Sequence, residues 1–113
     1  MSMTAAEIAG VVGTKRKTWW PTHSDEYNYL HFDYAHGQWN IQSKFGQNVS
    51  ALSSAFVELA FIGAAVRELA KRNVIFKIQT LDGWATVGGI DSHGNGPTLL
   101  HALVAALNES EGA

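Results

Sequence analysis

The sequence predicts an α+β fold. Two ββα units form one four-stranded antiparallel sheet, two main helices cover it, and a short helix precedes it. Three observations support this prediction. Two pairs of segments with alternating apolar residues are each joined by a turn signal. Each pair is followed by a long run of apolar residues at helical spacing. Strand pairs and helices therefore come in separate groups, which is typical of α+β proteins.

Length and composition describe an ordinary globular chain of 113 residues, the usual size of one domain. We expect a single domain with three segments: an N-terminal helix and basic-aromatic arm over 1–22, a first ββα unit over 27–72 and a second over 73–109. A net charge of −2 argues against general nucleic-acid binding, which needs a basic surface. Because the chain has no cysteine, disulfides and thiol catalysis are excluded.

The same totals lead to expectations about location and assembly. The N-terminus lacks the charged start and long apolar run of a secretory signal. The most apolar region, 55–70, carries Glu58, Arg67 and Glu68 and is too short and too charged to span a bilayer. We therefore expect a cytoplasmic protein without membrane contact. A charged fraction of only 16%, together with four tryptophans, indicates that another subunit covers part of the surface, which predicts a homo-oligomer.

The N-terminal segment begins with a helix signal. Thr4 and Glu7 fit a capping box, so a helix is expected from about Ala5 to Val12. The basic-aromatic arm that follows, TKRKTWWP, has two interpretations. It is an arm that reaches a phosphate or a stacked base, or it is a solvated connector whose two tryptophans pack on the core.

The first ββα unit is predicted from alternation and then from helical spacing. Residues 27–34 and 39–43 alternate as two strands, with Trp39 near the start of the return strand. Ser50 or a neighbouring polar residue is expected to cap a helix that runs to about Arg72. That helix carries two apolar stripes, and two stripes need two partners, so either a subunit contact or deep burial is expected. The stripes are Leu52, Phe56, Leu59, Gly63, Val66 and Ala70, and Val57, Phe61 and Ala64.

The second unit repeats this plan. Asp82-Gly83 is a strong hairpin signal between an alternating strand and a return strand over 84–90, which again begins with a tryptophan, Trp84. A loop with four glycines between Gly88 and Gly96 follows, and Pro97 fits the first position of a final helix. The similarity of the two halves is a weak signal of duplication, because hairpin geometry alone produces the same plan.

The glycine loop is the candidate ligand site. Its backbone N–H groups and the positive end of the final helix can hold an anion, with short polar side chains around it. The alternative is a simple bulge and turn before a capped helix. Phe76 and Trp84 are core residues or a stacking wall beside the loop, and Arg67 either reaches water or is a buried cation held for a phosphate. The predicted ligand-binding residues are Arg67, Phe76, Trp84, Ile90, Asp91, Ser92, His93, Gly94, Asn95, Thr98 and His101.

Metal and catalytic patterns are weak. His93, His101 and Asp91 supply zinc ligand types, but they lack the spacing of a structural site. Ser92 and His93 are neighbours in sequence, which is poor geometry for a catalytic triad. We therefore expect no metal, no cofactor and no enzymatic activity.

With these residues in place, the chain resembles small bacteriophage accessory proteins of the αβα-sandwich kind, which share a Trp-bearing hairpin, a Gly/Asp-rich loop and a Pro-led helix rich in Ala and Leu. Residues 84–107 carry this likeness. More loosely, the chain is similar to the phage anti-Thoeris sponge family, whose oligomeric members bind a cyclic ADP-ribose signal without altering it. The resemblance implies a site made of 90–95, an aromatic residue from the 76–84 hairpin and an arginine such as Arg67, closed by a neighbouring subunit.

The function expected from this resemblance is a non-catalytic phage anti-defence protein in the host cytoplasm. It would sequester a nucleotide-type immune signal, a cyclic ADP-ribose isomer or a cyclic oligonucleotide, at a subunit interface. The scarcity of arginine, with only Arg16, Arg67 and Arg72, argues against a ligand with many phosphates. The alternative is a protein-protein inhibitor or structural accessory protein. It would dock on a host protein through Val57, Phe61, Ala64 and the Trp19-Trp20 pair.

Overall fold

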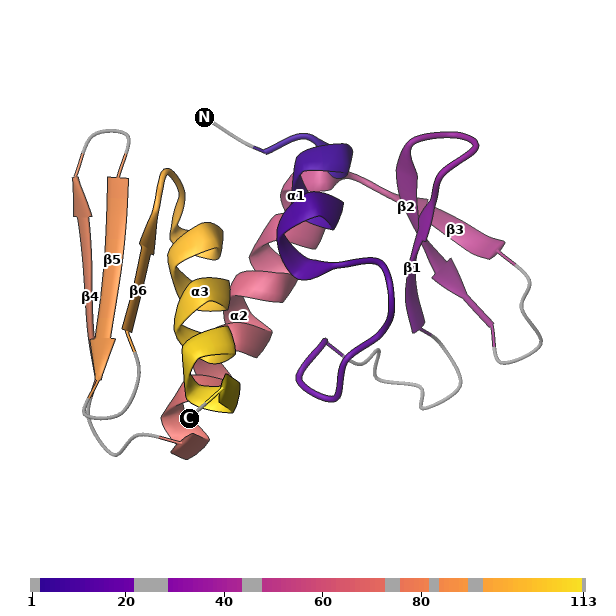
Figure 1. Ribbon diagram of the computed structural model, residues 1–113. Coiled ribbons are helices and arrows are strands. Elements are labelled where there is room, and N and C mark those ends of the chain that lie inside the picture. Colours follow the sequence, from indigo (N-terminus) through magenta and orange to yellow (C-terminus); the bar gives the residue numbers. More distant parts are fainter. Residues whose placement is uncertain are drawn as a thin grey trace. The chain divides into compact units, whose positions relative to one another are not determined.

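The computed structural model describes residues 3–21, 29–43, 48–72, 76–81, 84–89 and 93–112. Their elements confirm the α+β class (Figure 1). The three helices and six strands, in chain order, are α1 (Ala5–Val12), β1 (Tyr29–Asp33), β2 (Gln38–Gln42), β3 (Asn48–Leu52), α2 (Ser54–Arg72), β4 (Phe76–Leu81), β5 (Trp84–Gly89), β6 (His93–Gly96) and α3 (Leu99–Gly112).

The predicted four-stranded sheet is wrong. The structure has two separate three-stranded antiparallel sheets, in the orders β1-β2-β3 and β4-β5-β6. The prediction missed β3 and β6, whose sequences NVSAL and HGNG are short and contain polar residues or glycine. Residues of this kind have low strand propensity, so pairing with the neighbouring strand decides their conformation.

The chain divides into two compact units, Met1–Phe61 and Ile62–Ala113, called here the N-terminal and C-terminal units. The division falls inside α2, whose first half belongs to one unit and whose second half belongs to the other. The sequence pattern instead separates its two ββα units at residue 73. Each unit is a three-stranded meander with helical segments.

In the N-terminal unit, the predicted helix start is confirmed. The Glu7 N–H donates to Thr4 Oγ1 at 3.1 Å, the Thr4 N–H donates to Glu7 Oε1 at 3.2 Å, and Gly13 ends α1 with a φ of 88°. Such a positive φ favours glycine. In the β1–β2 turn, Asp33 Oδ1 accepts the Ala35 N–H at 3.0 Å.

Aromatic side chains fill the core of the N-terminal unit. Trp39 of β2 is fully buried, and its ring lies 5.8 Å from that of Trp20 and 5.3 Å from that of Phe61. Its indole N–H donates to the Ala5 carbonyl at 3.1 Å, which ties β2 to α1. Trp19 is also buried, with its ring against Phe61. The two arm tryptophans therefore pack on the core, as the second interpretation of this segment predicts.

The helix α2 begins at Ser54, directly after β3, and ends at Arg72 as predicted. Ser50 lies in β3, and the cap is the neighbouring polar residue Ser53, whose Oγ accepts the Phe56 N–H at 3.2 Å. One stripe of α2 is buried, and another includes Phe56 at 57% exposure and Leu59 at 69%. The buried stripe comprises Val57, Phe61, Ala65 and Leu69.

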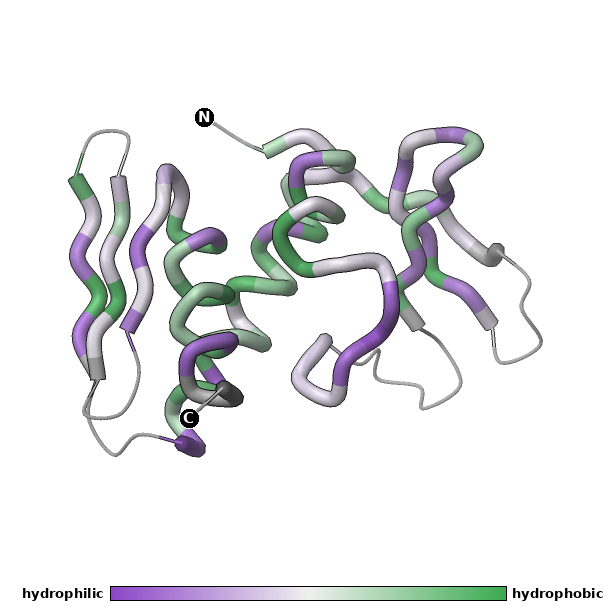
Figure 2. The backbone as a smooth tube through the Cα atoms, in the orientation of Figure 1, coloured by the Kyte–Doolittle hydropathy of each residue, from purple (hydrophilic) through white to green (hydrophobic). Residues whose placement is uncertain are grey.

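In the C-terminal unit, α3 packs on β6 and β5. It is apolar along most of its length, as its colour in Figure 2 shows. Its fully buried side chains include Leu100, Leu103 and Leu107. The Arg72 guanidinium at the end of α2 donates to the Leu107 carbonyl at 3.1 Å, which ties α2 to α3 within this unit. It also donates to Glu68 Oε1 on the same helix at 3.2 Å.

Candidate functional site

The segment predicted as an open glycine loop is largely a strand. Gly88 and Gly89 lie in β5, and His93–Gly96 form β6, which pairs with β5 from Gly88↔His93 to Ala85↔Gly96. The backbone in such a ladder is extended, and its N–H groups point alternately toward and away from the neighbouring strand. The described part of the segment is therefore not a nest of inward N–H groups, and that prediction is wrong for residues 93–96.

Gly94 has a packing role instead. A Cβ at Gly94 would lie 2.5 Å from the Ala102 carbonyl oxygen and 2.5 Å from the Ala106 nitrogen. Gly96 is similarly placed, because its Cβ would lie 2.5 Å from the His101 Cβ. Glycine on this side of β6 thus lets the alanine-rich side of α3 approach the sheet closely.

Thr98 and His101 form the start of α3. The His101 N–H donates to Thr98 Oγ1 at 3.2 Å, and the Ala102 N–H donates to the Thr98 carbonyl at 3.2 Å, which makes Thr98 the N-cap. Thr98 Oγ1 also lies 2.7 Å from His101 Nδ1. The helix begins at Leu99, so the placement of Pro97 at the first helical position is wrong by two residues.

The other predicted site residues are spread out. Ile90, Asp91 and Ser92 lie outside the described residues, as does the side chain of Phe76, the first residue of β4. Arg67 is exposed on α2, so it reaches water and is not a buried cation. The predicted residues that the structure brings together are Trp84, His93, Gly94 and Asn95, all on β5 and β6.

Trp84, His93 and Asn95 share a sheet surface with residues that the sequence analysis did not single out, whereas Gly94 faces α3. Ala85 and Val87 of β5 are buried toward α3, so the alternate residues of β5 point to the opposite side, which we call the outer face. The strand register places three rows on this face. They are Leu81 and Trp84; Gln79, Thr86 and Asn95; and Lys77, Gly88 and His93.

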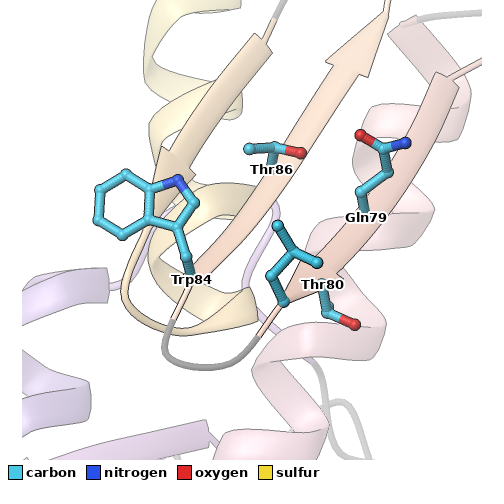
Figure 3. A pocket seen from close by; sticks show the side chains of 5 residues that line it. Gln79, Thr80, Trp84 and Thr86 are labelled. Atoms are coloured by element: carbon cyan, nitrogen blue, oxygen red, sulfur yellow. The ribbon is translucent and has the colours of Figure 1, made fainter.

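Two adjoining hollows follow the outer face. One, of about 350 Å³, lies beside Trp84 and Leu81 (Figure 3). The other, of about 360 Å³, lies beside Lys77 and His93. Gln79 and Thr86 line both, so the two hollows adjoin at these residues, and we call them together the trough. The three rows are two residues apart, which makes the trough roughly 13 Å long.

The chemistry of the trough changes from one end to the other. The first row is apolar, with Trp84 at 47% exposure and Leu81 at 78%. The middle row offers two side-chain amides and one hydroxyl, which donate and accept hydrogen bonds. The last row carries the Lys77 amine and the His93 imidazole. An aromatic surface, neutral polar groups, and an amine with an imidazole therefore follow one another along one sheet.

Among the described residues, Glu109 is an acidic group at the Lys77 and His93 end of the trough. Glu109 Oε1 of α3 lies 3.6 Å from His93 Nδ1, and both side chains are well exposed. An anion that binds His93 therefore competes with this carboxylate. Over the described residues, no group of three His, Asp or Glu side chains is close enough to hold a metal ion. Asp91, the third zinc ligand type considered above, is outside those residues.

The sequence contained a signal for the missed residues Lys77, Gln79 and Thr86. The Asp82-Gly83 hairpin sets the register of the two strands that flank it. With Leu81 opposite Trp84, it follows that Gln79 is opposite Thr86 and Lys77 is opposite Gly88, as observed. Alternation then places these side chains on the same side as Trp84.

Comparisons of the chain with protein-family models, curated proteins and solved structures gave no match. As for membranes, none of the helices within the described ranges is both long and apolar enough to cross a bilayer.

Proposed function

We propose that this protein is a non-catalytic binding protein that sequesters a nucleotide-type signalling molecule, a cyclic ADP-ribose isomer or a cyclic oligonucleotide, in the trough on the outer face. The phage anti-defence role follows from the resemblance to the sponge family. The observation that carries the proposal is the order of groups along the trough, from the exposed Trp84 indole to Lys77 and His93.

Each part of a nucleotide has a matching group in this order. A base stacks on an exposed indole, and such stacking contributes about 1–3 kcal/mol per base. The amides of Gln79 and Asn95 and the Thr86 hydroxyl can bond the base edge or a ribose hydroxyl. The Lys77 amine supports a phosphate as a point charge. The length of roughly 13 Å fits a base, a sugar and a phosphate in sequence.

The charge of the trough limits the number of phosphates. Among the described residues it holds one lysine and one histidine, and the Glu109 carboxylate beside His93 opposes the charge of the lysine. Among the described residues that line the two hollows there is no arginine, and Arg72 is already bonded to Glu68 and to the Leu107 carbonyl. Ligands with many phosphates favour several bidentate arginine contacts. The proposal therefore favours a ligand with one or two phosphates.

Calorimetric titration tests this proposal with a panel of ADP-ribose isomers and cyclic mono- and dinucleotides. We expect one class to bind the natural protein and to be recovered intact after denaturation. Trp84→Ala should weaken binding by about tenfold or more, the equivalent of one lost stacking contact. Tyr34→Ala is the matched control, because Tyr34 is also an exposed aromatic residue but lies directly after β1 in the N-terminal unit.

Three outcomes would contradict the proposal. A folded protein that binds no member of the panel has no nucleotide site of this kind. Equal binding by the natural protein and Trp84→Ala would show that the indole does not contact the ligand. Conversion of the ligand during incubation would show an enzyme rather than a sequestering protein.

A second candidate function has an observation of its own. The surfaces predicted to dock on a host protein include Val57, Phe61, Trp19 and Trp20, and all four are buried in the N-terminal unit. The exposed stripe of α2 with Phe56 and Leu59 takes their place as an apolar helix surface. In that case Phe56→Ser with Leu59→Ser would abolish inhibition of the partner, whereas Trp84→Ala would leave it unchanged.

A further inference from the structure

The strand β4 presents an open edge. Within the part of the chain that the structure describes, β4 pairs with β5 alone, and its register is unbroken from Phe76↔Gly89 to Leu81↔Trp84. Natural edge strands are commonly protected by proline, bulges, several charges or short length. The sequence FKIQTL has six residues, no proline and one charge. This edge is therefore a template for another strand.

The inner side of β4 is exposed as well. Ile78 is opposite the buried Val87 and so points to the same side as α3, yet it is 38% exposed. The reason is that α3 packs on β6 and β5. An aliphatic side chain at an open strand edge gains burial when the sheet is extended past it.

The hairpin fixes which backbone groups point outward. Two residues separate Leu81 from Trp84, and the pair that flanks a two-residue hairpin exchanges both of its hydrogen bonds. Bonded and non-bonded pairs alternate in an antiparallel ladder. The backbone groups of Lys77, Gln79 and Leu81 therefore bond to β5, and those of Ile78 and Thr80 face the open edge.

We propose that the occupant of this edge is a second copy of the chain, whose β4 pairs antiparallel with the first across a two-fold axis at Ile78. Residues directly opposite in an antiparallel pair share a face, and this register keeps both outer faces on one side of a continuous six-stranded sheet. It sets Phe76 opposite Thr80 of the partner subunit and Lys77 opposite the partner's Gln79. The only charge of β4 thus never faces itself, which makes the strand complementary to its own copy.

The other strand edges are less suited to such pairing. β6 has four residues, two of them glycine, and Pro97 follows it without an N–H. β3 has an irregular register against β2, with a shift between Ile41 and Gln42. Lack of continuity and low strand propensity weaken an added strand at these edges.

The dimer also adds to the proposed ligand site, and this step rests on the proposed function. The partner's Lys77 lies beside Gln79, which lines both hollows of the trough. Each trough therefore gains a second amine from the other subunit. A phosphate near Gln79 then has a cation on either side, so ligand binding and dimer formation support each other.

Single cysteines test the register, because the natural chain has none. Across the axis, the two Ile78 Cα atoms are about 5.5 Å apart, within disulfide range. Oxidation of Ile78→Cys should give a covalent dimer. Thr80→Cys is the matched control on the same strand and side. Its two copies are offset by four residues, roughly 13 Å, and should remain uncrosslinked.

Sedimentation of the natural protein provides the second measurement, since it should show a dimer at micromolar concentration. Ile78→Pro removes an outward N–H, which an edge strand tolerates, and should give a folded monomer with a circular dichroism spectrum like that of the natural protein. A natural protein that sediments as a monomer would overturn the proposal. Equal crosslinking of both cysteine variants, or a folded Ile78→Pro protein that still dimerises, would do the same.

Titration with the tightest nucleotide of the panel tests the shared site. The Ile78→Pro monomer should bind roughly two- to fivefold more weakly than the dimer, the range expected for one exposed charge contact. Equal affinity of the monomer and the dimer would show that the partner's Lys77 does not contact the ligand. A dimer that binds no nucleotide would contradict the proposed function and still support the β4 pairing, so failure of the one proposal can be distinguished from failure of the other.

Discussion

The two units share one plan of strands and helix but differ in the burial of the tryptophan in the middle strand. Each has three antiparallel strands followed by a helix, with a tryptophan near the start of the middle strand. Trp39 is fully buried, and its indole N–H is bonded to the Ala5 carbonyl. Trp84 is 47% exposed and lines a hollow. An aromatic residue at the same place in the plan is thus structural in one unit and available to a ligand in the other.

The difference comes from how each sheet is covered. In the N-terminal unit, large side chains from β1, β2, α2 and the arm fill the core, and Phe32 and Phe61 lie against Trp39. In the C-terminal unit, glycines of β6 meet alanines of α3 at close approach. That packing needs no aromatic residue on the inner side. Trp84 is therefore free to lie on the outer face.

The largest expected effect is the loss of Trp39. Trp39→Ala removes a buried aromatic side chain and should lower the free energy of unfolding by about 3–5 kcal/mol. Trp84→Ala is the paired control and should change it by less than about 1 kcal/mol, because half of that side chain is already in water. Urea unfolding measures both. Similar losses for the two variants would contradict the comparison.

The close packing of the C-terminal unit is the next target. Gly94→Ala places a Cβ within 2.5 Å of the α3 backbone and should cost about 1–3 kcal/mol, as overpacking does. Gly63→Ala is the matched control on α2, where a Cβ meets nothing within 4 Å. It should stabilise the protein by up to about 1 kcal/mol, because alanine favours helix. A neutral Gly94→Ala would show that α3 does not approach β6 so closely.

The helix caps give a smaller effect, one in each unit. Thr4→Ala and Thr98→Ala should each cost about 1 kcal/mol in thermal or urea unfolding, because each removes the oxygen that accepts an N–H in the first turn. Thr98 was also predicted to bind ligand. If it serves only as a cap, Thr98→Ala leaves nucleotide affinity unchanged, and a tenfold loss of affinity would return it to the site.

The smallest effect concerns acid stability of the β1–β2 turn. The hydrogen bond between the His36 ring and the Asp33 carboxylate, at 2.7 Å, lowers the pKa of Asp33 below its ordinary value of 3.8. A lowered carboxyl pKa stabilises the folded state above the unfolded pKa, and this contribution is lost as the pH falls through the folded value. The urea midpoints of the natural protein and Asp33→Asn should therefore converge below about pH 4. A constant difference down to pH 2.5 would contradict this assignment.

Local signals predicted much of this fold. The Thr4–Glu7 capping box, the β1–β2 and β4–β5 hairpins and the body of both long helices all depend on contacts between residues close in sequence. The strands β3 and β6 could not be predicted in that way. Their sequences favour loops, and each is a strand because of a partner across the sheet. Because these two strands were missed, the predicted number of strands in each sheet was wrong.

The candidate site also depends on strand pairing, so the sequence indicated only some of its residues. Trp84, His93 and Asn95 were chosen as neighbours of a glycine loop, and the structure joins them instead through the pairing of β5 with β4 and β6. Gly94 follows from packing against α3, which no short-range pattern reveals. The positions of Lys77 and Gln79 could have been predicted from the register of the hairpin. Both lie on the outer face together with Trp84.

The exposed Trp84 indole is the central claim, and the four tryptophans allow a direct test. Each indole N–H gives one cross-peak in a ¹H–¹⁵N correlation spectrum, and Trp84→Phe assigns the peak of interest. Titration with the nucleotide panel should move the Trp84 peak alone, because Trp19, Trp20 and Trp39 are buried in the N-terminal unit. A spectrum in which no ligand moves that peak, or in which a bound ligand moves the buried indoles and not Trp84, would contradict the account.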